Sequence, residues 1–143
     1  MAQTKVRFKG LERFADKLNK LNQEQINQFS EDAIKELAAR LLRKARLRTP
    51  VGEYPDSTGK KGGTLRRGWE VGDVTREGDT FKIELTNPTE YASYVEFGHR
   101  TRDHRDWVEG RFMLTISERE LEADAPRILE NKLDKFIGGL FNE

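Results

Sequence analysis

One long amphipathic stretch constrains the fold of this chain more than any other feature of its sequence. Between residues 23 and 48, small or apolar side chains recur at the period of an α-helix: Ile26, Ser30, Ala33, Ile34, Leu37, Ala38, Leu41 and Ala45. The helix should end before Thr49 and Pro50, because a residue that precedes proline avoids the α region. Its acidic residues come early and its basic residues late, which suits the helix dipole. The sequence therefore predicts one long helix over residues 23–48.

The residues around this helix predict a small antiparallel sheet. Residues 6–8 alternate apolar and charged side chains, which favours an edge strand, and residues 11–21 have the spacing of a short helix. After the long helix, residues 65–71 and 81–85 alternate as two strands with turn chemistry between them. Trp69 on the first of these strands is expected in the core. A β-hairpin is therefore expected in the middle of the chain.

Two further helices are expected in the C-terminal half. Residues 90–97 predict a short helix that Gly98 closes. In the final helical stretch, Pro126 should kink or restart the helix, and the glycines at 138–139 should end it. The fold class is therefore α+β, with N-terminal helices (one long), a central antiparallel hairpin or small sheet, a short helix and a C-terminal helix.

The length of 143 residues fits a single domain, residues 1–143, without a linker. Two long polar loops are expected inside it, at residues 50–63 and 99–110. Loops of this length are usually either functional or disordered. Both are therefore candidate sites for contact with a partner.

The composition argues against several functional classes. The chain has no cysteine, so it has no disulfide, no thiol nucleophile and no cysteine-based metal site. No apolar run is long enough to cross a bilayer, and the N-terminus lacks the apolar stretch of a secretory signal. We therefore expect a protein that is made and kept in the cytosol, without a membrane.

Basic residues are concentrated between Arg40 and Arg67, where nine basic residues stand against two acidic ones. Such a cluster can hold phosphates or an acidic protein surface, or it can be a solvated helix end followed by a lysine-bearing loop. A non-specific nucleic-acid-binding module is therefore one functional alternative. The candidate partner-binding residues are Arg40, Arg43, Arg46, Lys60, Lys61, Arg66 and Arg67.

Glu96 is a carboxylate in apolar company, between Val95 and Phe97. Such a carboxylate can become a general acid, and a small hydrolase or nuclease built on Glu96 and His99 is a further alternative. No second carboxylate or nucleophile is placed to help, so no catalytic residue is expected. We expect Glu96 to pair with an arginine such as Arg111.

The polar loop at 99–110 holds two kinds of candidate residue. His99 and His104, with nearby aspartates, suggest a metal site, but interleaved arginines would oppose a cation, and we expect neither metal nor cofactor. Arg102 and Arg105 should pair within the loop or with a neighbouring subunit. Trp107 should anchor a contact with another subunit, because indoles in polar loops are often interface anchors.

A resemblance to a known family is carried by residues 91–99, which read YASYVEFGH. They resemble the YA-x-YVEFG signature of the head–tail joining proteins of tailed phages, also described as tail-completion or tail-terminator neck proteins. Residues 49–51 and 63–66 are similar to the family's TPV…TG-x-LR loop, with residues 53–62 as an insertion. Residues 111–113 stand where the family has a PF element, with Arg111 in place of the proline.

The resemblance implies a structural protein without an active site. Members are small α+β subunits that assemble into a ring, commonly a hexamer, between the head connector and the tail tube. The implied partners are further copies of the chain, the head connector or head-completion protein, the tail tube protein, and transiently the DNA in the lumen. The implied location is the virion neck or tail, and the host cytoplasm during assembly. Such genes also occur in prophages.

An acidic run in the C-terminal segment is a candidate counterpart for the basic residues. It consists of Glu118, Glu120 and Glu122, followed by Asp124. Closed rings use heterologous contacts, in which one patch meets a different patch on the next subunit. We therefore expect this acidic run to meet the basic surface of residues 40–48 across the subunit boundary.

Overall fold

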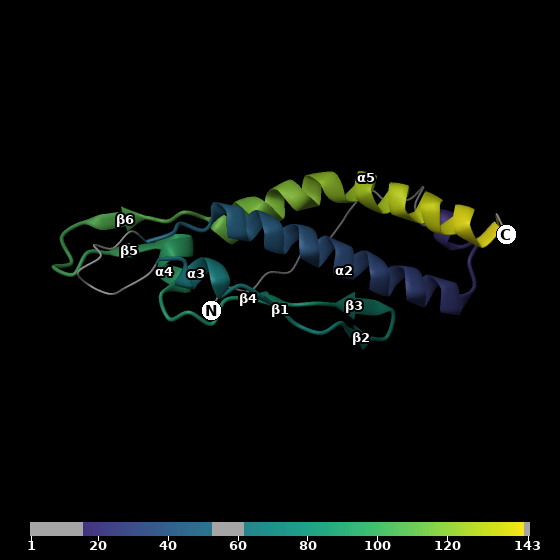
Figure 1. Ribbon diagram of the computed structural model, residues 1–143, viewed down its shortest axis with the longest axis horizontal. Helices are drawn as coiled ribbons and strands as arrows, with labels where there is room; N and C mark the ends of the chain where they lie inside the picture. The colour runs from purple at the N-terminus through teal and green to yellow at the C-terminus, as the bar shows by residue number, and fades with distance from the viewer. Residues whose placement is uncertain (1–15, 53–61, 142–143) are drawn as a thin grey trace.

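Two long antiparallel helices form the body of the protein. The computed structural model describes residues 16–52 and 62–141. Helix α2 (Gln23–Arg48) and helix α5 (Met113–Phe141) lie side by side along the long axis and make the most extensive contact between any two elements described (Figure 1). The fold is α+β, as the sequence predicts, because short strands accompany these helices.

Helix α2 has the bounds that the sequence predicts, because local signals define both of its ends. At the start, the Asn22 side chain accepts a hydrogen bond from the Gln25 amide at 2.8 Å, and the Gln25 side chain accepts one from the Asn22 amide at 3.0 Å. This reciprocal capping box satisfies two amides that the first helical turn leaves without partners. At the other end, Thr49 has an extended backbone before Pro50.

The core lies between the two long helices. Buried residues of α2 face buried residues of α5, and Trp69, only 1% exposed, closes this core as predicted. The rings of Phe29 and Phe136 meet near the other end, with their centroids 5.6 Å apart. The residues that α2 and α5 contribute to this core are Phe29, Ala33, Leu37, Leu41, Ala45, Met113, Leu114, Leu121, Ala125, Ile128, Leu129 and Leu133.

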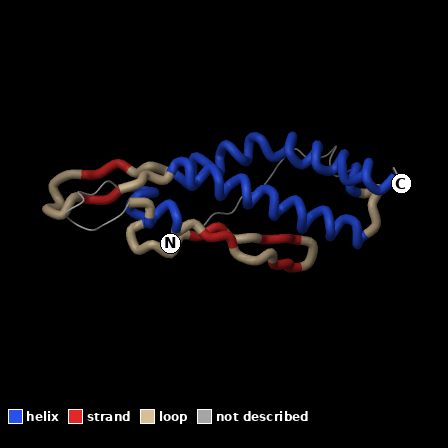
Figure 2. Tube along the Cα trace, viewed as in Figure 1, coloured by secondary structure: helices blue, strands red, loops and turns tan. Residues whose placement is uncertain are grey.

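A β-hairpin runs along α2. Strand β1 (Glu70–Val71) pairs with β4 (Leu85–Thr86), and β2 (Thr75–Glu77) pairs with β3 (Thr80–Lys82), both antiparallel. Figure 2 shows these short strands in red beneath the helical pair. Residues 72–74 interrupt the ladder, and one backbone bond from Gly72 to Glu84 at 2.8 Å bridges the gap.

The predicted first strand is wrong over residues 65–69, because β1 begins only at Glu70. Residues Thr64–Arg67 form the short helix α3 instead, and Leu65 is buried from this helical turn. Gly63 enters the turn with a left-handed φ of 94°, and the amide of Arg67 closes it on the Gly63 carbonyl at 2.9 Å. Alternation of apolar and charged residues over so few positions does not distinguish one helical turn from a strand.

The expected polar loop at 99–110 is also corrected by the structure. Helix α4 (Ala92–Phe97) leads directly into strand β5 (Gly98–Arg100), which pairs with β6 (Trp107–Glu109). This hairpin extends beyond the ends of α2 and α5 in Figure 1. The feature is therefore a projecting arm of regular structure.

Helix α5 runs through Pro126, where the sequence predicts a kink or a restart, so the predicted restart is wrong. Pro126 lies inside it, and the helix runs on through residues 138–139. Its neighbours Ala125, Ile128 and Leu129 are buried against α2, and this packing outweighs the loss of one backbone bond at the proline.

Some sequence expectations lie outside the described residues. They are the edge strand at 6–8, most of the helix at 11–21, the insertion over 53–61, and the lysines at 60 and 61. Residues 16–18 are helical, and Leu21 packs into the core. In the part of the chain described, no helix combines the length and the apolar character needed to cross a membrane.

Candidate subunit interface

The residues of the YASYVEFGH stretch divide into a buried set and an exposed set. On α4, Ala92 and Glu96 are 0% and 1% exposed, so they face the interior. Tyr91, Tyr94 and Phe97 point outward, with exposed fractions of 43%, 58% and 57%. The same short helix is therefore anchored by one face and presents three aromatic rings with the other.

The anchor is Glu96, whose carboxylate caps the start of α5. The Leu114 amide donates to both of its oxygens, at 2.7 and 3.0 Å, and the Thr115 amide donates at 3.3 Å. These are amides that a helix leaves unpaired in its first turn, where a negative charge is also favoured by the helix dipole. Burial raises the pKa of the Glu96 carboxyl above its usual value, although these two amides act in the opposite direction.

The expected pairing of Glu96 with Arg111 is therefore wrong. Arg111 contacts α4 through its backbone, because its amide donates a hydrogen bond to the Val95 carbonyl at 2.7 Å. Arg111 itself is exposed. A buried carboxylate needs hydrogen-bond donors, and the first turn of α5 supplies them without a second charge. Both Glu96 oxygens are occupied in this way.

Two glycines let the arm cross the end of α4 at close range. Gly98 has a φ of 90°, and a Cβ there would lie 2.5 Å from the Val108 carbonyl oxygen and 2.9 Å from the Trp107 indole. A Cβ at Gly110 would collide with the Glu96 carbonyl. The backbones therefore pack directly on one another, and the Trp107 indole lies against Gly98.

An exposed aromatic face results from this packing. We use this name for the large exposed side chains at this end of the subunit, which come from α4, its N-cap and both sides of strand β6: Tyr91, Tyr94, Phe97, Trp107 and Val108. Trp107 and Val108 are 54% and 43% exposed. Large apolar residues gathered at one end of a soluble protein mark an interaction surface, and aromatic residues dominate the energetics of such surfaces.

His99 packs against two residues of this face, Tyr94 and Val108. Its ring lies beside that of Tyr94, with centroids 5.5 Å apart, and it pairs with Val108 across the arm. Its Nδ1 atom is buried without a hydrogen-bond partner among the described residues. The side chain is therefore part of the packing beneath the aromatic face.

The turn of the arm is organised by Asp103. Its carboxylate accepts hydrogen bonds from the Thr101 hydroxyl at 2.5 Å and from the Arg105 amide at 3.1 Å. The hydrogen bond from Thr101, followed by that from Arg105, lowers the pKa of Asp103. Arg102 and Arg105 are exposed, and within the described residues neither side chain has an ion pair.

Thr49 is a second anchor, which the sequence reasoning missed. It is 1% exposed; its hydroxyl donates to the Ala45 carbonyl at 2.5 Å and accepts from the Trp69 indole at 2.7 Å. The Arg66 guanidinium donates twice to the Thr49 carbonyl, at 3.1 and 2.7 Å. Arg66 therefore caps the C-terminal end of α2, and its contact with a partner stays a prediction.

One residue of the acidic run of α5 also forms ion pairs within the chain. Glu120 pairs with Lys44 at 3.1 Å and with Arg48. The structure therefore places Glu120 against α2 of its own chain, and its contact across a subunit boundary stays a prediction. Glu122 is exposed, and Glu118 is half-buried. Antiparallel packing of α2 and α5 puts these charges opposite one another, which sequence spacing could not show.

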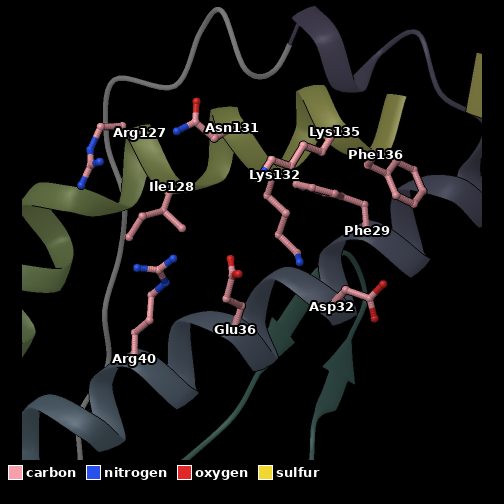
Figure 3. A pocket seen from close by; sticks show the side chains of 10 residues that line it. All are labelled: Phe29, Asp32, Glu36, Arg40, Arg127, Ile128, Asn131, Lys132, Lys135 and Phe136. Atoms are coloured by element: carbon pink, nitrogen blue, oxygen red, sulfur yellow. The ribbon is translucent and has the colours of Figure 1, made fainter. Parts of the chain in front are cut away.

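The remaining basic residues lie on different surfaces. Arg43, Arg46 and Arg67 are exposed, while Arg40 lines a cleft of about 410 Å³ between α2 and α5. Figure 3 shows this cleft, with Arg40 beside Glu36 and with Lys132 extending from α5 toward the carboxylates of α2. It is lined by Phe29, Asp32, Glu36, Arg40, Arg127, Ile128, Asn131, Lys132, Lys135 and Phe136. Its mixed charges do not favour a single class of ligand.

Comparison with known proteins identifies the family. The model of a family described as "Bacteriophage HK97-gp10, putative tail-component" matches residues 12–98. The match covers more than half of the chain and ends at Gly98, the last residue of the YVEFG stretch. No curated protein and no solved structure matches the chain. The chain therefore belongs to the HK97 gp10-like family of bacteriophage tail components.

Proposed function

We propose that this tail component is a structural subunit of an oligomeric ring at the phage neck. In this proposal the ring completes the tail tube and joins it to the head connector, and genomic DNA passes through its lumen. The observation that carries the proposal is the exposed aromatic face. Its five residues are all exposed, and the elements that carry them lie at one end of the subunit, where a protein partner can reach them (Figure 1).

The way this face is held supports an assembly role. Glu96 ties α4 to the first turn of α5, and Gly98 and Gly110 lock the arm against α4. Aromatic side chains on a rigid support lose little conformational freedom when they bind a partner, which favours affinity. The buried half of the YASYVEFGH stretch therefore positions its exposed half.

We further propose that the protein acts without catalysis. Both Glu96 oxygens are hydrogen-bonded to the amides of α5, and His99 is packed against Tyr94 with its Nδ1 buried. Neither the Glu96 oxygens nor the Nδ1 atom of His99 is therefore open at the surface. The proposed partners are further copies of the chain, commonly in a hexamer, the head connector or head-completion protein, the tail tube protein and, without sequence preference, DNA.

The experiment is a deletion of the gene in the phage or prophage that encodes it, followed by electron microscopy of the particles. We expect heads and tails that are not joined, with the defect reversed by the wild-type gene supplied in trans. Recovery of normal, DNA-filled, tailed particles without the gene would overturn the proposal. As a matched pair, Tyr94→Ser with Trp107→Ser should fail to complement, whereas Leu140→Ser, at an exposed site on α5, should complement.

A further inference from the structure

A basic ridge is exposed at the C-terminal end of α2. Residues 40–52 and 62–67 contain seven basic residues and no acidic one. Four of the seven make a contact inside the chain, because Lys44 and Arg48 pair with Glu120, Arg66 binds the Thr49 carbonyl, and Arg67 donates to the Gly62 carbonyl at 3.2 Å. The charges of Arg43, Arg46 and Arg67 are nevertheless available, because these three residues are exposed and lack an ion pair within the described residues. We name these three arginines and Leu47 the basic ridge; Arg43, Arg46 and Leu47 lie in the last turns of α2, and Arg67 lies on α3.

The ridge has the composition of a protein-binding surface. Leu47 is 73% exposed, the highest exposed fraction among the large apolar residues described. It follows Arg46 directly and lies one helical turn from Arg43, so an apolar side chain stands among positive charges. An apolar centre with a charged rim is the usual anatomy of an interface.

An acidic hairpin is exposed on the same subunit. Residues 70–86 contain five acidic and two basic residues. Both basic side chains are already engaged: Lys82 pairs with Glu77 at 2.7 Å, and Arg76 binds the Gly78 carbonyl at 2.7 Å and covers the Phe81 ring.

Four exposed carboxylates of this hairpin have no ion pair within the described residues. They are Glu70, Asp73, Asp79 and Glu84, and with them we define the acidic hairpin. Val71, 38% exposed, lies between the first two of these carboxylates. The hairpin and the ridge are therefore complementary. Each has charged residues around an exposed apolar residue, and the charges are negative on the hairpin and positive on the ridge.

We propose that the acidic hairpin of one subunit binds the basic ridge of a second copy of this chain. The inference rests on the proposed ring, in which each subunit uses two different surfaces in a head-to-tail contact. Charge complementarity selects the partner and its orientation and excludes the reversed arrangement, in which like charges would meet. The two surfaces are also close in charge, because the three exposed arginines of the ridge stand against the four exposed carboxylates of the hairpin.

The proposal replaces the acidic run of α5 as the counterpart of the basic residues. Glu120 already forms ion pairs with Lys44 and Arg48 of its own chain, whereas the carboxylates of the acidic hairpin are exposed. A duplex nucleic acid would also attract the ridge, but it would be repelled by the hairpin that lies along the same helix. The ridge therefore fits a second copy better than DNA.

Charge reversal tests the pairing. The ridge variant is Arg43→Glu with Arg46→Glu, the hairpin variant is Glu70→Lys with Glu84→Lys, and the control is Glu122→Lys with Glu130→Lys on α5. The readouts are ring formation in particle necks by electron microscopy and plaque titre on complementation, with circular dichroism to show that each variant folds. Ridge and hairpin variants should each lower the titre on the order of a hundredfold, because like charges then meet, and the control should not.

Rescue distinguishes pairing from a general defect. The ridge and hairpin variants expressed together should recover rings, because each then offers the surface that the other needs. A single chain with all four changes should also recover them. If each variant fails alone and neither combination is rescued, or if both variants assemble like the wild type, the pairing is overturned. If the ridge variant assembles normally but no longer binds DNA, the ridge is a DNA-binding surface, and the pairing is also overturned.

Cross-linking supplies a second readout, because the chain contains no cysteine. Leu47→Cys and Val71→Cys in one chain, treated with a short bismaleimide in assembled particles, should give a ladder of covalent multimers on a denaturing gel. Cysteines at 122 and 130 should give monomers. Multimers from the control pair alone would contradict the pairing. Wild-type particles that contain no ring of this protein would instead overturn the proposed function, so the two failures are distinguishable.

Discussion

The carboxylate of Glu96 accepts a hydrogen bond from the Leu114 amide at 2.7 Å, and this bond ties helix α4 to the first turn of α5. Glu96 and Leu114 are 18 residues apart in the chain. The glutamate of the YVEFG stretch is therefore an anchor of the fold, and its neighbours Tyr94 and Phe97 are the residues that it holds at the surface.

Removing this cap should destabilise the protein. Glu96→Ala leaves the Leu114 and Thr115 amides without a partner, and we expect a loss of about 2–4 kcal/mol in the free energy of unfolding. Glu96→Gln keeps one acceptor oxygen and should cost less. Urea unfolding measures both, and Glu90→Ala, at an exposed site before α4, serves as the control. Equal stability of Glu96→Ala and the control would show that the cap contributes nothing.

The same carboxyl should make stability depend on pH. Burial raises the folded-state pKa of Glu96 above 4.5, so the folded protein binds more protons than the unfolded chain between 4.5 and the raised pKa. The free energy of unfolding of the wild type, relative to Glu96→Gln, should therefore fall as the pH rises through that range and then level off. The pKa of Asp103 is lowered from 3.8, so Asp103 titrates below this range. A difference that stays flat or rises with pH contradicts the assignment.

How much of this structure the sequence predicts depends on how local each signal is. The bounds of α2 follow from Asn22, Gln25 and Pro50, which all act within a few residues of the helix ends. The partner of Glu96 could not be predicted, because backbone amides carry no side-chain identity and α5 approaches α4 only in the folded chain. Pro126 illustrates the same limit, because buried neighbours keep α5 intact across it.

The candidate site was predictable in part for the same reason. An exposed Trp107 follows from an indole among charged residues, but the arm that carries it depends on the contact of Gly98 with residues 107–110. The basic residues were visible in the sequence, whereas their division into paired and exposed groups depends on Glu120 and on the Thr49 carbonyl. Those partners lie far from them along the chain.

Gly98 should tolerate no side chain. Alanine there meets the Val108 carbonyl oxygen at 2.5 Å in a left-handed backbone region, so Gly98→Ala should cost about 2 kcal/mol or more and loosen the arm. Gly78 also has a positive φ, but nothing lies within 4 Å of a Cβ there, so Gly78→Ala should cost only about 1 kcal/mol for backbone strain. Hydrogen exchange of the arm amides and thermal unfolding compare the two. A larger cost at Gly78 would refute the crowding at Gly98.

Thr49 and Trp69 should be energetically coupled. Thr49→Val removes the acceptor of the buried Trp69 indole and should cost about 1–3 kcal/mol, because a buried donor is left unsatisfied. In Trp69→Phe that donor is absent, so adding Thr49→Val should cost less than it does in the wild type. A double-mutant cycle by urea unfolding measures this coupling. Strict additivity would mean that the 2.7 Å hydrogen bond makes no net contribution.

The aromatic face should serve assembly and not stability. Tyr94 and Trp107 are more than half exposed, so replacing both with serine should leave the melting temperature nearly unchanged and abolish incorporation into particles. Quantitative mass spectrometry of purified virions measures incorporation, with Leu140→Ser as the matched surface change. Normal incorporation of the double variant would remove the face from the assembly account.

The most direct test of the central claim is cryo-electron microscopy of the neck of particles that contain this protein. The account predicts a closed ring of copies of this chain between the head connector and the tail tube, with the aromatic face of each copy buried against a protein neighbour. A neck in which the density of this chain is absent, or in which Tyr94 and Trp107 of every copy face solvent, would contradict it.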